Sequence, residues 1–451
     1  RPMNDTATAS KQKTELPLDV PRAPADLWRR KFESFGLVFA RFAGLLIIVA
    51  APIFGYVVLA LPSVIVFMLQ ILTNLIRRSM FRRNIDGLPS LTPGEPPVPY
   101  LQEWPGVSII SPARNEEAGV EEAARSIAAL DYPDLEVIYV DDHSTDNTPA
   151  ILDRLSEEFP KLTVLHNPPT QEGWLGKANA VWQGLRESDA SKPWVLLMDA
   201  DVVLHPDALR QAVSLAVANK LDFLTCASYI DNKSLGEELY MPQAWAGIVA
   251  GSHFDRLNEA RTPSIGIGAF TMVKRSVYIA SGGHAAIRDR QPEDTLLAAL
   301  VKKHGGNMGV CWTSSMVRVR IYRGFKQLQQ FIVRKIRMQN QDGIPRILNR
   351  IVFILIQDVL PLPLFVAAVA RQVATGVPSI SMSVYAVFAL LAYMTCVGSH
   401  DGFRNIAYMR RHLEWFHPLG GLLRIYFYIR ASLQILGRKG MEWRGRDYSH
   451  S

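Results

Sequence analysis

Acidic residues follow two apolar runs of this sequence, at points where buried strands would end. Asp141 and Asp142 follow one run, and Asp199 and Asp201 follow the most strongly apolar of the expected strands. Because positions i and i+2 of a strand point to the same side, Asp199 and Asp201 can address one ion. Carboxylate oxygens suit Mg2+ or Mn2+, which keep open positions for substrate phosphates. Two such aspartates alone often mark a turn, so this metal prediction depends on their position and their companions.

Glu293 and Asp294 form a third acidic pair, directly before an amphipathic helical stretch at 295–304. One interpretation is that they compensate the dipole at the start of that helix, an effect of about 0.3–1 kcal/mol. The functional interpretation places both in a catalytic site and makes Asp294 a general base, which removes a proton from an acceptor hydroxyl. Upstream, Gly266 and Gly268 leave room for an acceptor to approach closely, although a bulged strand explains them equally well.

The remaining candidates suit a nucleotide and its phosphates. Asp141 and Asp142, at a strand end, can accept hydrogen bonds from a base or a ribose. The alternative is helix capping, which we favour only for Asp146. Lys177 follows a glycine-containing loop at a predicted helix start, where it can meet a diphosphate. The loop lacks the Gly-Lys-Ser or Gly-Lys-Thr ending of a Walker site, so by itself it identifies no phosphate site.

Short β-rich runs alternate with helical periods between residue 107 and about residue 320. The expected strands cover 107–111, 135–140, 162–165 and 194–198, and helices are expected between them, for example at 120–130 and 148–159. This alternation predicts an α/β domain with a mostly parallel, doubly wound sheet. Ligands of such sheets bind beyond the carboxyl ends of the strands, where the acidic residues lie.

An apolar segment at 42–76 predicts a membrane anchor. A continuous helix of this length would exceed a bilayer core of about 30 Å. Pro52 and Pro62 offer breaks, so we expect a hairpin of two short spans, or one span plus a partly interfacial segment. Arginines flank the segment on both sides, which by the positive-inside rule places both flanks in the cytoplasm.

Two further apolar segments, at 351–370 and 384–398, predict a re-entering membrane pair with both ends in the cytoplasm. The stretch 419–436 is apolar but carries Arg424 and Arg430, so an interfacial helix is expected there.

Composition limits the class of protein. The 451 residues carry a net charge of +7, with arginine and lysine concentrated near the apolar segments, and no nucleic-acid-binding module is recognisable. Three widely spaced cysteines predict neither a disulfide framework nor a zinc site, and they fit a reducing cytosol. The expected organisation is a flexible tail at 1–34, a membrane anchor of one or two spans at 35–83, a catalytic domain at 84–322, interfacial amphipathic helices at 323–350, a transmembrane pair at 351–400, and an interfacial helix with a tail at 401–451.

The order of these motifs resembles the inverting glycosyltransferase family 2, whose nucleotide-sugar-binding fold is called GT-A. The motifs are Pro112-Ala113-Arg114-Asn115-Glu116, Asp141-Asp142, Lys177 with Asn179, Asp199-Ala200-Asp201, and Glu293-Asp294. The resemblance spans Val107 to about Met338. It implies that Pro112 and Glu116 line a uridine pocket, that Asp142 contacts the base or ribose, that Asp201 binds the metal with Asp199 beside the nucleotide, and that Asp294 is the catalytic base.

Family members that extend polymers or glycosylate lipids usually carry Gln or Arg, two residues, then Arg-Trp, on a helix after the base. The best match here is Arg334 and Arg337, with Met338 in place of the tryptophan. Arg337 can address the leaving diphosphate. A basic interfacial helix that holds anionic lipid is an equally weighted alternative. The overall layout resembles ceramide glucosyltransferases and, most closely, the bacterial hopene-associated glycosyltransferases.

Together these features predict a bacterial inner-membrane enzyme with a cytoplasmic catalytic domain. The predicted reaction is a metal-dependent, inverting transfer of a sugar from a nucleotide sugar, a UDP-sugar, to a lipid hydroxyl. One alternative is a processive polysaccharide synthase, which needs enough membrane helices to form a channel. Another is a polytopic carrier without enzymatic activity, which should place ionisable residues inside its spans; Asp358 is the best candidate for such a residue.

Overall fold

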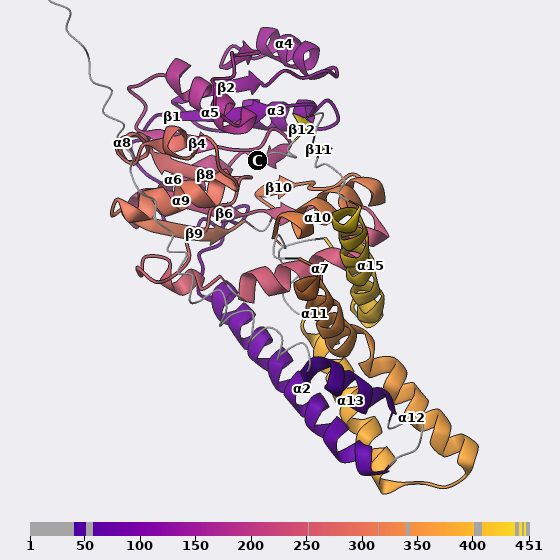
Figure 1. The fold of residues 1–451 in the computed structure, drawn as a ribbon. Helices are drawn as coiled ribbons and strands as arrows, with labels where there is room; N and C mark the ends of the chain where they lie inside the picture. Colours follow the sequence, from indigo (N-terminus) through magenta and orange to yellow (C-terminus); the bar gives the residue numbers. More distant parts are fainter. Residues whose placement is uncertain are drawn as a thin grey trace, which may run out of the picture.

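The computed structural model of the protein describes residues 40–50, 57–250, 252–313, 315–339, 343–400, 408–437, 442–443 and 446–447. An α/β domain carries a group of long helices that extend away from it (Figure 1). The N-terminal tail expected at 1–34, and Pro52, lie outside the described residues.

The α/β domain contains a seven-stranded sheet with the order β3-β2-β1-β4-β8-β6-β9. Its strands are β1 (Val107–Ala113), β2 (Leu135–Asp141), β3 (Leu162–His166), β4 (Trp194–Leu197), β6 (Phe223–Ala227), β8 (Thr271–Lys274) and β9 (Met308–Trp312). The four strands expected from the sequence are all present. The sheet is mixed, however, because β8 runs antiparallel to both β4 and β6. The chain enters β8 at Thr271, opposite Leu197 at the end of β4, and therefore runs back along it.

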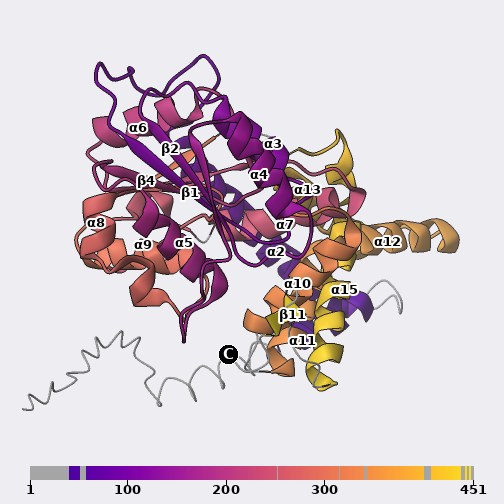
Figure 2. The same cartoon turned by 90° about the horizontal axis from the view of Figure 1, so that it is seen from above.

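Helices cover both faces of this sheet. Figure 2 shows α3 (Val120–Ala128), α4 (Thr148–Glu158) and α6 (Ala208–Ala218) on one face, and α5 (Gly176–Glu187) and α9 (Glu293–Lys303) on the other. The sequence of α3 explains its docking, since Val120, Ala123, Ala124 and Ile127 are buried at helical spacing and form one apolar stripe. A second sheet with the order β5-β10-β7 joins Val202–Leu204, Val317–Val319 and Tyr229–Ile230.

The helices outside the α/β domain form two groups. Helices α2 (Val57–Asp86), α12 (Pro361–Thr375) and α13 (Ile380–Gly398) extend farthest from the domain (Figure 1). Helices α7 (Leu235–Ala250), α10 (Phe325–Gln339), α11 (Ile344–Ile354) and α15 (His417–Leu436) lie between them and the sheets.

Two of the described helices are long and apolar enough to cross a membrane, namely Pro62–Asp86 and Ile380–Gly398. The pair Ile344–Val359 and Pro361–Thr375, bent by 55°, would be a third if it forms one span. The break expected at Pro62 is wrong, because α2 continues through that residue. A proline removes one hydrogen bond near the start of this 30-residue helix, and a long apolar helix tolerates that loss. The preceding apolar helix, Ala40–Ala50, is too short to span by itself.

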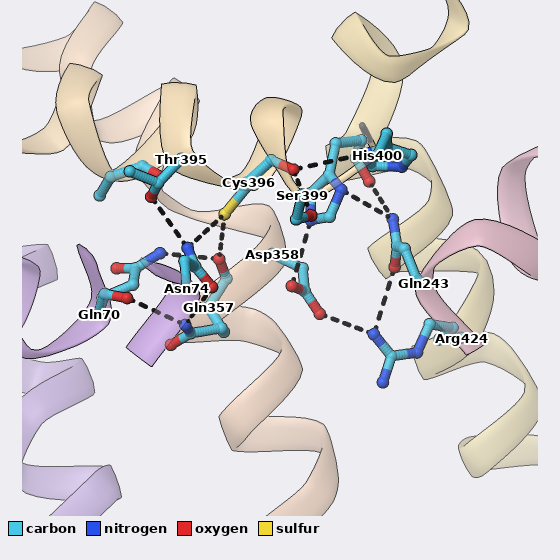
Figure 3. Close-up of polar contacts among 12 residues, drawn as sticks. Gln70, Asn74, Gln243, Gln357, Asp358, Thr395, Cys396, Ser399, His400 and Arg424 are labelled. Carbon is cyan, nitrogen blue, oxygen red and sulfur yellow. Dashed lines mark hydrogen bonds and ion pairs between the residues drawn. The ribbon is translucent and has the colours of Figure 1, made fainter. Parts of the chain in front are cut away.

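Buried polar side chains join these helices (Figure 3). Asp358, in the π-helical turn η3 (Leu355–Val359), lies 2.8 Å from Nη1 of Arg424 on α15. The same carboxylate lies 3.1 Å from Nε2 of His417, and Gln243 on α7 donates a hydrogen bond to the His417 carbonyl at 2.8 Å. The ion pair and hydrogen bonds therefore tie η3 and α15 to α7, which follows β7 of the small sheet.

A second set of contacts continues this network into α2 and α13. Gln357 donates to Asn74 Oδ1 at 2.8 Å, and Asn74 donates to the sulfur of Cys396 at 3.2 Å. Cys396 in turn donates to the carbonyl oxygen of Gln357 at 3.0 Å. Gln357, Asn74 and Cys396 thus satisfy one another's polar groups, as an apolar environment requires.

Candidate active site

The sequence-predicted acidic residues lie at the carboxyl ends of neighbouring strands. Asp141 is the last residue of β2, and it pairs in register with Ala113 at the end of β1. The strand β4 ends at Leu197, so Asp199 and Asp201 lie in the turn that follows it. The alternation of side chains along a strand therefore does not set the directions of these two side chains. The prediction that they address one ion because they are positions i and i+2 of a strand is corrected accordingly. Asp199 faces Lys177, whereas Asp201 lies beside Gly119 and Arg323.

Lys177 joins two of the acidic clusters. It is the second residue of α5, and its Nζ lies 2.7 Å from Asp199 Oδ1 and 2.6 Å from Glu293 Oε1. Desolvation lowers the pKa of Lys177, but the charges of Asp199 and Glu293 outweigh it, so the pKa lies well above its ordinary value. Burial opposes ionisation of Glu293, yet Lys177 brings the pKa of Glu293 down to about 2. At neutral pH the three groups are thus an ammonium between two carboxylates.

Asp294 has different electrostatics from its neighbour. It lies in the first turn of α9, where Oδ2 accepts a hydrogen bond from the Gly268 N–H at 3.0 Å. Burial, followed by the charge of Glu293, raises the pKa of Asp294 to about 6. Compensation of a helix dipole would lower this pKa. The dipole interpretation therefore describes Glu293 better than Asp294, which has the basicity expected of a general base near neutral pH.

Gly266 sets the position of Asp294. A Cβ atom on Gly266 would lie 2.1 Å from the carbonyl oxygen of Asp294, which is closer than any real contact. The residue therefore leaves room for the backbone of α9 rather than for an acceptor. A Cβ atom on Gly268 would meet Asp199, Asp294 and Lys177 at ordinary distances of 3.4–3.5 Å, so Gly268 lies among the charged groups.

The variant Gly266→Ala is expected to lower both stability and activity. Its methyl group must displace the start of α9, and such overpacking costs about 1–3 kcal/mol. Thermal unfolding of the purified protein should show a midpoint several degrees lower, roughly 2–4 °C per kcal/mol. The matched control is Gly268→Ala, whose methyl group meets no backbone and should leave the midpoint unchanged. Equal midpoints for the two variants would contradict this role for Gly266.

The structure brings five of the eleven predicted site residues into one small cavity. Its lining includes Pro112, Lys177, Asp199, Gly268, Glu293 and Asp294. It also includes His284, which the sequence argument did not select. His284 is buried, its Nδ1 lies 2.7 Å from the Tyr278 hydroxyl, and burial lowers its pKa to about 4. A neutral histidine therefore packs against the charged groups, and the preceding glycine pair at 282–283 was the only local signal for it.

The residues predicted to contact the nucleotide lie at the ends of β1 and β2. Asp141 is fully buried and accepts a hydrogen bond from the Ser144 N–H at 3.1 Å. Asp142 is 4 % exposed, and its Oδ2 lies 3.8 Å from Nη1 of Arg114. Glu116 donates its N–H to the Thr148 hydroxyl at 2.8 Å, which places it at the start of α4.

The capping interpretation of Asp146 is confirmed. Its Oδ1 accepts a hydrogen bond from the N–H of Thr148, the first residue of α4, at 3.0 Å. Asp146 thus satisfies an amide that the helix leaves without a partner.

Arg334 and Arg337 lie on α10 and are not among the residues that line the cavity. Nη1 of Arg337 donates to Oε1 of Gln434 on α15 at 3.2 Å. Lys335, between them, interacts electrostatically with the site. Desolvation lowers the pKa of Lys335, and the charge of Asp294 opposes that shift. The side chain of Met338 lies outside the described residues.

Two groups of residues have the chemistry to hold a metal. Asp199 and Asp201 supply hard oxygen ligands, with Lys177 occupying one oxygen of Asp199. Among the described residues, a separate group of Asp358, Cys396 and His417 offers ligand atoms within 4.8 Å of one another. Arg424 and the hydrogen bonds of Figure 3 already balance that second group, so it needs no ion to satisfy its polar atoms.

Comparison with known proteins agrees with the geometry. Residues 108–282 match the family described as glycosyl transferase family 2. The chain is 26 % identical over 357 residues to the 4,4'-diaponeurosporenoate glycosyltransferase of Staphylococcus aureus strain USA300, covering 76 % of this chain and 88 % of that relative. The protein of that name from strain MRSA252 is 25 % identical over the same length.

Solved structures with similarity include the mannosyltransferase PcManGT from Pyrobaculum calidifontis, in complex with GDP-Man and Mn2+. The TM-score is 0.45 at 21 % identity, covering 89 % of this chain and 99 % of that one. S. aureus TarS 1–349 in complex with UDP-GlcNAc gives a TM-score of 0.37 at 14 % identity, covering 75 % and 93 %.

The family match covers the elements that carry Pro112, Asp142, Lys177, Asp199 and Asp201. The family match ends before Asp294, but in the folded chain Asp294 lines the same cavity as Pro112, Lys177 and Asp199. Residues 108–282 therefore match a glycosyl transferase family 2 domain, and the chain is an enzyme, a glycosyltransferase.

Proposed function

We propose that this glycosyltransferase moves a sugar from a nucleotide sugar, a UDP-sugar, to a hydroxyl group of a membrane lipid, with inversion at the anomeric carbon. The observation that carries the proposal is the state of Asp294, a half-buried carboxylate with a pKa of about 6 that lines one cavity with Lys177 and Asp199. Such a group is ionised at neutral pH and basic enough to take a proton from an attacking hydroxyl.

In this reaction Asp294 accepts the acceptor's proton while the hydroxyl oxygen attacks the anomeric carbon in line with the departing nucleoside diphosphate. The paired side chains of Lys177, Glu293 and Asp199 line the cavity beside Asp294. The Gly268 N–H orients the base through its hydrogen bond to Oδ2. Glu293 acts on the base by its negative charge, which raises the basicity of Asp294.

The donor occupies the strand ends, with Pro112, Glu116, Asp141 and Asp142 around the nucleoside. Asp199 and Asp201 would hold Mg2+ or Mn2+, which supplies positive charge for the diphosphate. Because Lys177 is already paired with two carboxylates, we assign it to positioning Asp199 and Glu293 as well as to the diphosphate. Arg334 and Arg337 on α10 add positive charge at the side facing α15.

The acceptor is proposed to arrive from the bilayer. Two helices long and apolar enough to cross a membrane support this, and the amphipathic α10 and α15 would lie at its surface. The proposed placement is the inner membrane of a bacterium, with the catalytic domain in the cytoplasm. The proposed domain organisation is the one expected from the sequence, with the catalytic domain at 84–322 between an N-terminal anchor and a C-terminal transmembrane pair. The few candidate spans favour a single transfer over processive synthesis of a polysaccharide.

A relative named for 4,4'-diaponeurosporenoate supports a second class of acceptor, a lipid carboxylate. A sugar on a hydroxyl forms an acetal that resists mild alkali, whereas a sugar on a carboxylate forms an ester that alkali cleaves. The nature of the linkage therefore separates the two acceptors.

The test compares lipids from cells that express the wild type, Asp294→Asn, or no enzyme. Mass spectrometry should find alkali-stable hexosyl lipids with the wild type alone, and EDTA should stop their formation in membranes. Alkali-labile products would assign the carboxylate acceptor instead. Equal lipid profiles in all three strains, with the wild type shown to be expressed, would contradict the proposal.

Transfer is expected to decline as the pH falls through about 6, because Asp294 must be ionised to accept a proton and burial holds its pKa at about 6. Below that value kcat/KM should drop by about tenfold per pH unit, as for loss of one essential base. Rates measured from about pH 5 to 8 with a saturating divalent ion check this. An acid limb near pH 4, the value of an ordinary aspartate of about 3.9, would contradict the assignment.

A further inference from the structure

Two arginines from two helices lie over one aromatic ring, and a third arginine precedes that ring on its own helix. The Cζ atom of Arg41 lies 4.6 Å from the centroid of the Phe353 ring, and that of Arg77 lies 5.1 Å from it. Arg41 also donates to Asn349 Oδ1 at 2.7 Å. Arg350, one turn before Phe353 on α11, acts electrostatically on both of the other arginines. We call Arg41, Arg77, Arg350 and Phe353 the arginine cluster.

The arginine cluster carries excess positive charge. Each arginine opposes the charge of the others, and no described carboxylate lies within ion-pair distance of any of them. Asp358 attracts Arg77 from η3, but that carboxylate is already paired with Arg424 at 2.8 Å. The ring face of Phe353 attracts guanidinium groups without neutralising them. An added anion would therefore stabilise this arrangement, and a phosphate accepts paired hydrogen bonds from guanidinium groups.

The surroundings of the arginine cluster indicate where that anion comes from. Each of the three helices also exposes large apolar side chains: Leu46 is 69 % exposed, Ile76 is 49 % exposed, and Leu348 is 45 % exposed. Arg77 lies within the candidate membrane helix Pro62–Asp86. A free phosphate would gain nothing from these apolar residues, whereas the acyl chains of a phospholipid would cover them.

We infer that Arg41, Arg77 and Arg350 bind the phosphate of an anionic phospholipid, with its acyl chains against the exposed apolar residues of the same helices. The inference rests on the proposed membrane placement and not on the identity of the sugar or the acceptor. The bound lipid would fasten the start of the helix Ala40–Ala50 to α2 and α11, in addition to the hydrogen bond from Ser63 to the Ile47 carbonyl and the apolar contacts of Ile48.

The test uses the full-length protein in nanodiscs of phosphatidylcholine with phosphatidylglycerol as the minor component, so that the anionic lipid competes with an excess of the zwitterionic one. After extraction into detergent, native mass spectrometry counts the lipids that remain bound. Wild type should retain phosphatidylglycerol over phosphatidylcholine, and Arg41→Gln with Arg350→Gln should reduce that preference at least about fivefold. The matched control is Arg83→Gln, an exposed arginine on the same helix as Arg77 that lies outside the cluster and should retain the preference.

A charge-preserving variant and a competition with inorganic phosphate complete the test. Arg41→Lys with Arg350→Lys preserves the charge and should retain part of the preference, and circular dichroism with a thermal unfolding curve shows whether each variant is folded. Millimolar inorganic phosphate should not displace the lipid. Equal retention of the two lipids by the wild type would overturn the inference. So would a folded double Gln variant that prefers phosphatidylglycerol as strongly as the wild type, or displacement of the lipid by inorganic phosphate. Failure of the proposed sugar transfer would leave these lipid measurements unaffected.

Discussion

Asp294→Asn will abolish sugar transfer and leave nucleotide binding nearly unchanged. The amide has the shape of the carboxylate, so the hydrogen bond from the Gly268 N–H to Oδ2 can persist. It cannot accept a proton at neutral pH, and loss of a general base typically costs about 10²–10⁴ in rate. Single-turnover transfer together with calorimetric titration of UDP will separate the chemical step from binding.

Asp289→Asn is the matched control, because Asp289 is an exposed carboxylate five residues earlier in the chain. It should transfer sugar at the wild-type rate. The base assignment fails if Asp294→Asn turns over as fast as this control. It also fails if Asp294→Asn loses transfer only because UDP no longer binds.

Lys177→Met will reduce activity strongly and shift its pH dependence. The substitution leaves Asp199 and Glu293 without the ammonium that lies 2.7 Å and 2.6 Å from them. Removing one electrostatic partner from an active site typically costs about 10²–10³ in kcat. Since Lys177 lowers the pKa of Asp294, its loss must raise that pKa, and the acid limb should move above pH 6. Rates across pH, measured with saturating donor, will detect both effects.

Lys303→Met, in the last turn of α9, removes an exposed lysine and should change neither the rate nor the pH profile. A purely structural role for Lys177 would lower the amount of folded enzyme without moving the acid limb. An unchanged limb in the folded Lys177→Met variant would therefore exclude the electrostatic role and leave a packing role.

The sequence itself determined the strands that carry the site. Runs such as 194–198 are apolar over too short a length for a helix, and the helix at 120–128 has buried residues at helical spacing. These are local properties, because side-chain periodicity and backbone preference act within a few residues. The strand ends, and with them Asp141, Asp142 and Asp199 as candidates, followed directly from these local properties.

Tertiary structure decided how those candidates meet. The direction of β8 depends on where the chain returns from α7, and the continuity of α2 through Pro62 depends on a long apolar helix around it. The pairing of Lys177 with Glu293 joins residues 116 positions apart, which no local spacing encodes. The raised pKa of Asp294 likewise arises from burial and from neighbours brought by other elements. Residue types and local periods thus determined the parts of the site, whereas long-range packing decided their charges, their partners and the arginine cluster.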